Sequence, residues 1–245
     1  MNGAAGERSP VALVTGAGRR LGQAIALALA RRGYDLAIHY HSSAAGAELT
    51  ASSAAALGRR TVLLEADLTD VGQAASLVAD AHRAMGALDV VVNSAAVMLR
   101  TPFGAVSPAE WDYVMALNLR APFLIAQEAA SHLSDGGSIV NIADLAAFET
   151  WPDYIPHGAS KSALVYLTRA LARVLAPRVR VNGVAPGSIL PPPEFGERAR
   201  ERLARTTPLG RWGDPEDVAQ AVLYLVEARY VTGEVIFVDG GRHIR

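Results

Sequence analysis

Seven short apolar runs recur along the chain, and a longer segment with helical spacing separates each run from the next. The runs are rich in β-branched and aliphatic residues at consecutive positions, so both faces of each predicted strand should be buried. They cover 11–15, 35–40, 61–67, 89–95, 137–143, 179–185 and 234–240. Alternation of such strands with helices is typical of a parallel sheet covered on both faces. The sequence therefore predicts an α/β fold built on a doubly wound parallel sheet.

The intervening segments carry several signals for helix ends. Ser107-Pro108 and Asp214-Pro215 predict helix starts, and glycines at 33, 58 and 86 predict helix ends. The predicted helices cover 21–33, 45–58, 71–86, 107–133, 159–176 and 214–228. An irregular stretch at 188–212, with a basic helix near 195–206, interrupts the alternation after the sixth strand. At the carboxyl edge of a sheet, such an insertion is expected to be a substrate lid.

Composition limits the domain count and the partners. The 245 residues, 51% of them hydrophobic, can close one large core, so we expect a single domain over 1–245. A net charge of −1 without a basic field favours a small-molecule partner over nucleic acid or a membrane. The chain has no cysteine and its six histidines lack metal-ligand spacing, so no metal is predicted. Without a long apolar run or signal peptide, we expect a cytoplasmic protein.

A glycine-rich segment, TGAGRRLG at 15–22, directly follows the first predicted strand and opens a helix. Glycines in such a turn let the backbone approach a pyrophosphate, and the unpaired N–H groups at the helix start bind its charge. We therefore expect Gly16, Leu21 and Gly22 to contact a dinucleotide. The spacing departs from the usual dinucleotide fingerprint because Arg20 stands at the position of its middle glycine.

The end of the second predicted strand bears on the choice of cofactor. It consists of four residues without a carboxylate: His39, Tyr40, His41 and Ser42. A fold that selects NAD places a carboxylate here to bind the adenosine ribose, whereas this chain has none before Glu48. An uncharged strand end beside Arg19 and Arg20 suits a 2′-phosphate. The sequence predicts NADPH/NADP+, with the alternative that both arginines only cover a solvated rim.

Eight motifs spread over nearly the whole chain resemble successive landmarks of the short-chain dehydrogenase/reductase family. They are TGAGRRLG (15–22), ADLTD (66–70), NSAA (93–96), LNLRAPF (117–123), GSIVNIAD (137–144), SKSALVYLTRALA (160–172), VRVNGVAPG (179–187) and TGEVIFVDGG (232–241). Within that family, the glycine-rich turn and the HYHxS strand end are similar to those of pteridine reductases. The resemblance implies a single-domain Rossmann fold with seven strands, NADPH binding, and a homodimer or homotetramer formed through the helices at 107–133 and 159–176.

The resemblance also implies further cofactor contacts. They fall on Asp67, Leu68, Asn93, Ala95, Lys161, Pro186, Gly187 and Ser188. Asp67 would lie near the adenine, although a carboxylate after a strand could equally cap the next helix.

Four residues of this chain stand at the positions of the family's catalytic residues. Asn118 matches an asparagine that would hold a water, and Lys161 matches the lysine that holds the nicotinamide ribose. Asp144 stands where the family has a serine, and an aspartate there again resembles pteridine reductases. His157 stands at the position of the family's tyrosine, which gives or takes the substrate proton. This departure leaves the identity of the proton donor open.

Three interpretations of the proton donor follow. His157 can carry a transferable proton near neutral pH, stabilised by Asp144 and opposed by Lys161. Alternatively Tyr154, separated from Lys161 by six residues as in enoyl-ACP reductases, supplies the proton, provided that Pro156 lets it join the helix. In the third interpretation the site is impaired, and the protein binds nucleotide in a regulatory or structural role.

The sequence constrains the identity of the substrate less than that of the cofactor. Met98 and Ala96 stand where pteridine reductases have an aromatic residue and a serine, so a pterin is one candidate and another carbonyl or imine compound is the other. Candidate pocket residues are Phe148, Trp151, Leu190, Phe195 and Trp212. The predicted function is hydride transfer from NADPH to a C=O or C=N bond of a small molecule.

Overall fold

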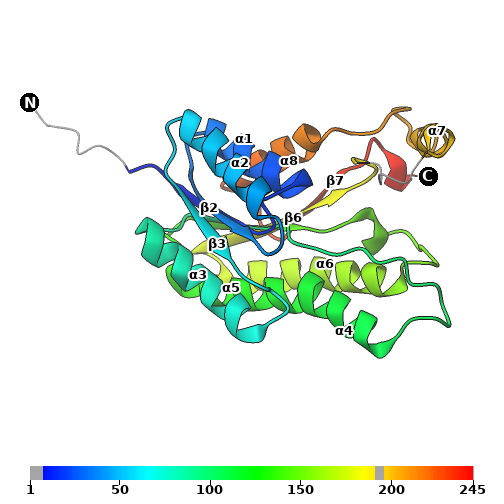
Figure 1. Cartoon of the computed structure of the whole chain (residues 1–245), viewed down its shortest axis with the longest axis horizontal. Coiled ribbons are helices and arrows are strands. Elements are labelled where there is room, and N and C mark those ends of the chain that lie inside the picture. Colours follow the sequence, from blue (N-terminus) through cyan, green and yellow to red (C-terminus); the bar gives the residue numbers. More distant parts are fainter. Residues whose placement is uncertain (1–7, 191–195, 245) are drawn as a thin grey trace, which may run out of the picture.

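The computed structural model describes residues 8–190 and 196–244, and within them seven strands form one parallel sheet (Figure 1). The strands are β1 (Val11–Val14), β2 (Asp35–Tyr40), β3 (Thr61–Glu65), β4 (Val90–Asn93), β5 (Gly137–Ile142), β6 (Val179–Pro186) and β7 (Val235–Val238). Their order in the sheet is β3-β2-β1-β4-β5-β6-β7, and every neighbouring pair is parallel. The predicted fold class is confirmed.

Helices cover both faces of this sheet (Figure 1). The α-helices are α1 (Arg20–Arg31), α2 (Ala44–Ala56), α3 (Val71–Met85), α4 (Pro108–Met115), α5 (Ala121–His132), α6 (Ile155–Leu175), α7 (Glu197–Ala204) and α8 (Pro215–Glu227). Figure 1 shows α1, α2 and α8 on one face and α3 to α6 on the other. Along β1, Ala12 and Val14 join the core on the α1 side, whereas Val11 and Leu13 join the core on the α3 side. This alternation explains the unbroken apolar runs.

Two predicted helix boundaries are wrong. The helix expected over 107–133 is divided, because a π-helical turn at Ala116–Arg120 separates α4 from α5. The helix expected from 159 begins four residues earlier, at Ile155, because Pro156 occupies the first turn. Proline is favourable there since the N–H that it lacks would have no partner within the helix.

The predicted lid falls partly outside the described residues. Residues 191–195, which include Phe195, lie outside the described residues. The helix α7 lies in the described part of the predicted lid that follows them. Figure 1 shows α7 beyond the main body of the sheet, close to the C-terminal end of the chain. None of the helices in the described ranges is long and apolar enough to cross a membrane.

The glycine-rich turn lies where the sheet order reverses. β1 pairs with β2 on one side and with β4 on the other, so successive crossovers leave it in opposite directions. A crevice opens outside the carboxyl ends of strands at such a point, and ligands of open α/β folds bind there. Gly22 packs directly beneath the turn, because a Cβ at this position would lie 2.2 Å from the carbonyl oxygen of Gly16.

His39 joins this turn to the end of β3. Its Nδ1 accepts the N–H of Gly16 at 3.1 Å, and we assign the proton to Nε2, which lies 3.1 Å from the carbonyl oxygen of Ala66. Only 2% of His39 is exposed, and burial lowers its pKa to about 4. The side chain of His39 thus joins two segments of the protein, and the cofactor contact predicted for this residue stays a prediction.

Acid should weaken the fold through His39. Between its ordinary value of 6.5 and about 4, the unfolded chain binds a proton at this histidine that the folded chain excludes. The stability that His39 contributes is present above this range and is lost as the pH falls through it. Urea denaturation at several pH values should show a steeper acid loss of unfolding free energy in the wild type than in His39→Gln. Parallel curves would contradict the assignment.

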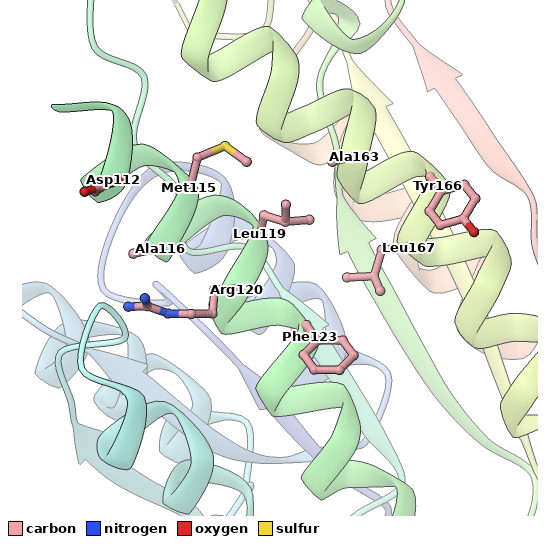
Figure 2. Close-up of a pocket in the computed structure, with 9 residues that line it drawn as sticks. All are labelled: Asp112, Met115, Ala116, Leu119, Arg120, Phe123, Ala163, Tyr166 and Leu167. Atoms are coloured by element: carbon pink, nitrogen blue, oxygen red, sulfur yellow. The ribbon is translucent and has the colours of Figure 1, made fainter. Parts of the chain in front are cut away.

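A groove of about 660 Å³ lies between the α4–α5 region and α6 (Figure 2). It is lined by Asp112, Met115, Ala116, Leu119, Arg120, Phe123, Ala163, Tyr166 and Leu167. Figure 2 shows Leu119 and Phe123 on one side and Leu167 on the other. Phe123 is 42% exposed and Tyr166 is 75% exposed, so the groove presents apolar surface.

Candidate active site

The π-helical turn places Asn118 beneath the segment that follows β4. Its Oδ1 accepts the N–H of Val97 at 2.9 Å, and its Nδ2 donates to the carbonyl oxygen of the same residue at 2.9 Å. The two bonds fix the orientation of the amide. Nδ2 also lies 3.1 Å from Oγ of Ser160, which in turn donates to the carbonyl oxygen of His157. The side chain of Asn118 thus connects the segment after β4 to α6. The water that Asn118 is predicted to hold would therefore have to bind its backbone.

His157 lies in the first turn of α6 and is 3% exposed. Its Nδ1 is 3.1 Å from the carbonyl oxygen of Val97. Because a carbonyl oxygen only accepts hydrogen bonds, we assign a proton to Nδ1. The Nδ2 of Asn118 lies farther from Nδ1, at 3.4 Å, and has better acceptors elsewhere. Nε2 is buried and has no hydrogen-bond partner among the described residues.

Asp144 faces the unpartnered nitrogen of His157. It caps a short 3-10 helix at Leu145–Ala147, where Oδ1 accepts the N–H of Ala146 at 2.8 Å. The other oxygen, Oδ2, lies 3.5 Å from Nε2 of His157. A bare imidazole lone pair would repel this carboxylate, whereas an imidazolium N–H would be attracted to it. The arrangement therefore directs Nε2 of His157 toward Oδ2 of Asp144.

Lys161 follows His157 by one helical turn and lies on the same face of α6. Nζ donates to the carbonyl oxygen of Ile142 at 2.7 Å. Only 3% of the residue is exposed, and burial lowers its pKa to about 8, although the charge of Asp144 acts in the opposite direction. The structure thus brings together four of the predicted catalytic residues: Asn118, Asp144, His157 and Lys161.

Tyr154 lies outside the helix that carries His157 and Lys161. It occupies the N-cap position of α6, with φ −136° and ψ 33°, so helical periodicity cannot align it with the lysine. Its backbone forms a parallel bridge with Thr101, and its ring lies edge-on to Trp151 with 6.2 Å between centroids. Tyr154 therefore belongs to the loop that enters α6.

The hydroxyl of Thr15 joins the glycine-rich turn to the segment after β4. Its Oγ1 accepts the N–H groups of Ser94 at 2.9 Å and of Ala95 at 3.0 Å. The side chain of Asn93 is directed into the sheet, where Nδ2 donates to Oδ1 of Asn141 at 2.9 Å. Thr15 was not predicted as a site residue, although it stands first in the TGAGRRLG motif.

The two arginines of the turn occupy different surroundings. Arg20 has φ +53°, a conformation that is costly for a residue with a side chain, which explains why glycine is usual at this position. Its Nη2 donates to the carbonyl oxygen of Leu190 at 3.3 Å, at the start of the predicted lid. The guanidinium of Arg19 is exposed and makes no hydrogen bond or ion pair with another described residue.

The end of β2 is open beside Arg19. His41 and Ser42 are exposed, and the hydroxyl of Tyr40 donates to Glu65 at 3.3 Å on the neighbouring strand. A cation, hydroxyl groups and an imidazole thus surround this strand end, which contributes no carboxylate of its own.

The remaining predicted cofactor residues also lie at the carboxyl ends of strands. Oδ1 of Asp67 accepts two hydrogen bonds from Thr69, which lower the pKa of Asp67, and the cap of α3 is Asp70 instead. The side chain of Leu68 is buried in the core, so only its backbone could reach a ligand. Pro186 ends β6, and Gly187 and Ser188 continue over the edge of the sheet.

The chain is similar to proteins of one enzyme family over nearly its whole length. A family model described as Enoyl-(Acyl carrier protein) reductase matches residues 16–243. The granaticin polyketide synthase putative ketoacyl reductase 2 of Streptomyces violaceoruber is 39% identical over 245 residues, covering 96% of this chain and 97% of the relative.

Solved structures agree with this similarity. A short-chain dehydrogenase/reductase from Serratia marcescens BCRC 10948 has a TM-score of 0.91 and 36% identity, covering 96% of this chain and 98% of that chain. A blue fluorescent protein from a metagenomic library, solved in complex with NADPH, has a TM-score of 0.90 and 38% identity, covering 95% of this chain and 97% of that chain. The chain belongs to the short-chain dehydrogenase/reductase family. The predicted class, an NADP(H)-dependent oxidoreductase of this family, is confirmed.

The buried Lys161 should make stability depend on pH above neutrality. Below about 8 the folded chain carries a desolvated ammonium, and between about 8 and the ordinary value of 10.5 only the unfolded chain keeps that proton. The unfolding free energy of the wild type should therefore rise, relative to Lys161→Met, as the pH increases through this interval. Urea denaturation of both proteins without cofactor measures this difference, and a difference independent of pH would contradict the desolvated ammonium.

Proposed function

We propose that this chain reduces a C=O or C=N bond of a small molecule with NADPH, and that His157 delivers the proton. One observation carries the proposal. Nε2 of His157 is buried, has no hydrogen-bond partner within the described ranges and lies 3.5 Å from Oδ2 of Asp144. A group that can hold a proton is thus aimed at a carboxylate beside the expected ribose-binding lysine.

The residues at the carboxyl edge fit a phosphorylated nicotinamide cofactor. The N-terminus of α1 presents backbone N–H groups to a pyrophosphate. The guanidinium of Arg19, which makes no hydrogen bond or ion pair with another described residue, can bind a 2′-phosphate beside Tyr40 and Ser42. Oδ2 of Asp67 makes no hydrogen bond to another described residue and can accept one from an adenine amino group.

The proton movement follows from the hydrogen bonds of His157. NADPH supplies the hydride that reduces the electrophilic carbon. As negative charge develops on the substrate oxygen or nitrogen, Nε2 of His157 gives up its proton and the imidazole becomes neutral, while Nδ1–H stays on the carbonyl oxygen of Val97. Asp144 stabilises the imidazolium before the transfer. Lys161, held by Ile142, uses its remaining N–H groups to bind the ribose.

Two alternatives to proton delivery by His157 remain. Tyr154 could deliver the proton from the loop before α6, although its backbone places it outside the helical face of Lys161. An impaired site would bind NADPH without turnover. The first alternative predicts that activity depends on the phenol of Tyr154, and the second predicts cofactor binding without oxidation.

The substrate proposal rests on exposed apolar side chains after β4 and β5. Met98 is 47% exposed, Phe148 is 43% exposed and Phe103 is 89% exposed. Such a surface suits a flat or apolar carbonyl compound, and ketones, quinones and pterins form the test panel. The pteridine reductase resemblance and the pterin substrate stay proposals.

The groove between the α4–α5 region and α6 supports the proposal of a homodimer or homotetramer. Its apolar lining, which includes Phe123 and Tyr166, belongs to the two helical regions that the family resemblance assigns to the interface. A second copy of this chain would bury this surface. The expectation of a cytoplasmic protein also stays a prediction.

Removal of the imidazole should strongly reduce turnover. General acid catalysis contributes about a hundredfold to ten-thousandfold, so His157→Phe should lower kcat/KM by about that factor. Asp144→Asn should lower it by about tenfold because the imidazolium loses its counter-charge. NADPH oxidation measured by absorbance across the substrate panel tests both variants, and NADPH binding measured by fluorescence controls for folding.

Tyr154→Phe is the matched control for His157→Phe, and its kcat/KM should stay within about threefold of the wild type. If activity collapses in Tyr154→Phe and not in His157→Phe, the phenol is the acid. If the wild type binds NADPH tightly and oxidises it with no member of the panel, the binding interpretation replaces the reductase.

Arg19 should determine the preference for the phosphorylated cofactor. A charge-assisted hydrogen bond is worth about 1.5–3 kcal/mol, so Arg19→Ala should raise the Kd of NADPH by about tenfold to a hundredfold. The Kd of NADH should change by less than about threefold, because NADH lacks the phosphate. Arg20→Ala is the matched control, since Arg20 contacts Leu190. Equal losses for NADH and NADPH in Arg19→Ala would refute this role.

A further inference from the structure

The turn that follows β7 is held by the carboxylate of Asp239, whose side chain is 2% exposed. Oδ1 accepts the N–H of Gly241 at 2.9 Å, and Oδ2 accepts the N–H of His243 at 2.7 Å. Nδ1 of His243 lies 2.8 Å from Oδ2, and its ring stacks on Phe237 with 3.9 Å between centroids. These contacts fix the backbone on both sides of Arg242.

The guanidinium of Arg242 binds two segments that are distant in the chain. Nε and Nη2 donate to the two carboxylate oxygens of Glu149 at 3.1 and 2.8 Å, and Nη1 donates to Oγ of Ser188 at 3.3 Å. The group lies over the ring of Trp151, 5.7 Å from its centroid, and the indole N–H donates to the same Glu149 at 2.9 Å. The side chains of Arg242 and Glu149 are 17% and 27% exposed, so solvent screens this pair less than the surface pairs.

Glu149 and Trp151 lie in the segment 145–154, which joins Asp144 to the helix of His157. The same segment is also bonded to the chain that follows β4, because the N–H of Thr101 donates to the carbonyl oxygen of Asp153 at 2.7 Å. Arg242 thus completes a series of contacts that runs from the segment after β4, across 145–154, to the turn after β7.

The contact to Ser188 adds the segment after β6. Gly187 packs directly against the turn that carries Arg242, since a Cβ on Gly187 would lie 2.6 Å from Cβ of Asp239. A single guanidinium from the turn after β7 therefore meets the segments that follow β5 and β6, at the edge of the sheet where the reaction is proposed to occur.

We propose that Arg242 is a positioning residue of the reductase site, which acts through Glu149 and Trp151 to hold the segment 145–154 beside the substrate. This inference rests on the proposed function. Arg242 itself touches no reacting group. An arginine suits the role because its planar fork binds both carboxylate oxygens, the hydroxyl and the indole face at once, whereas a lysine offers one compact ammonium.

The first test compares Arg242→Gln, Glu149→Gln and the double variant with the wild type. Each single variant should raise the KM of the carbonyl substrate by about fivefold to twentyfold, with kcat and the Kd of NADPH within about threefold. The double variant should show the same loss as one single variant, because both remove one interaction. Arg242→Lys should recover only part of the loss.

Arg32→Gln is the matched control, because Arg32 makes a two-pronged pair with Glu227 between α1 and α8, away from the candidate site. It should leave the KM of the substrate unchanged. If Arg242→Gln and Arg32→Gln have equal effects on KM, or if the losses of the two site variants add, the positioning role is overturned.

Hydrogen exchange gives a second readout that needs no turnover. The N–H groups of Phe148, Glu149 and Tyr154 are bonded within the segment 145–154, so loosening it should raise their exchange rates. Arg242→Gln should raise exchange in peptides from this segment, and Arg32→Gln should not. An inactive wild type would reject the proposed function alone, whereas unchanged exchange in Arg242→Gln would reject the role of Arg242 whatever the activity.

Discussion

The two opposed hydrogen bonds between the amide of Asn118 and the peptide of Val97 hold the candidate site together. They are made possible by the π-helical turn, which interrupts the helix at the residue that must reach the segment after β4. The carbonyl oxygen of Val97 that this pairing fixes also faces Nδ1 of His157. The imidazole is therefore held with its other nitrogen toward Asp144. One local irregularity in a helix thus orients His157 with its Nε2 toward Asp144.

In the proposed function, a histidine at position 157 changes the charge of the site, and Asp144 supplies the opposite charge. A phenol that carries its transferable proton is neutral, whereas an imidazole in the same state is a cation. That cation would stand one helical turn from the buried ammonium of Lys161. Asp144 supplies the opposite charge to both groups, at 3.5 Å from Nε2 of His157, and it opposes the effect of burial on the pKa of Lys161. A serine at this position could offer neither effect.

The strands of the fold could be predicted from the sequence because a sheet covered on both faces requires apolar residues at consecutive positions. The motif positions likewise brought Asn118, Asp144, His157 and Lys161 together. The orientations of side chains could not be predicted in this way: Arg20 turns toward Leu190, and His39 is buried beneath the glycine-rich turn. Arg242 carries no local signal at all, since its partner Glu149 is 93 residues away in the chain.

The pH dependence of single-turnover NADPH oxidation, compared between the wild type and His157→Tyr, shows whether the group at position 157 donates the proton. A phenol ordinarily keeps its proton to about pH 10, well above the range in which an imidazole titrates. If the group at position 157 is the donor, His157→Tyr should keep its rate to a higher pH than the wild type does. Superimposable profiles would contradict a donor at position 157, because the donor would then lie elsewhere.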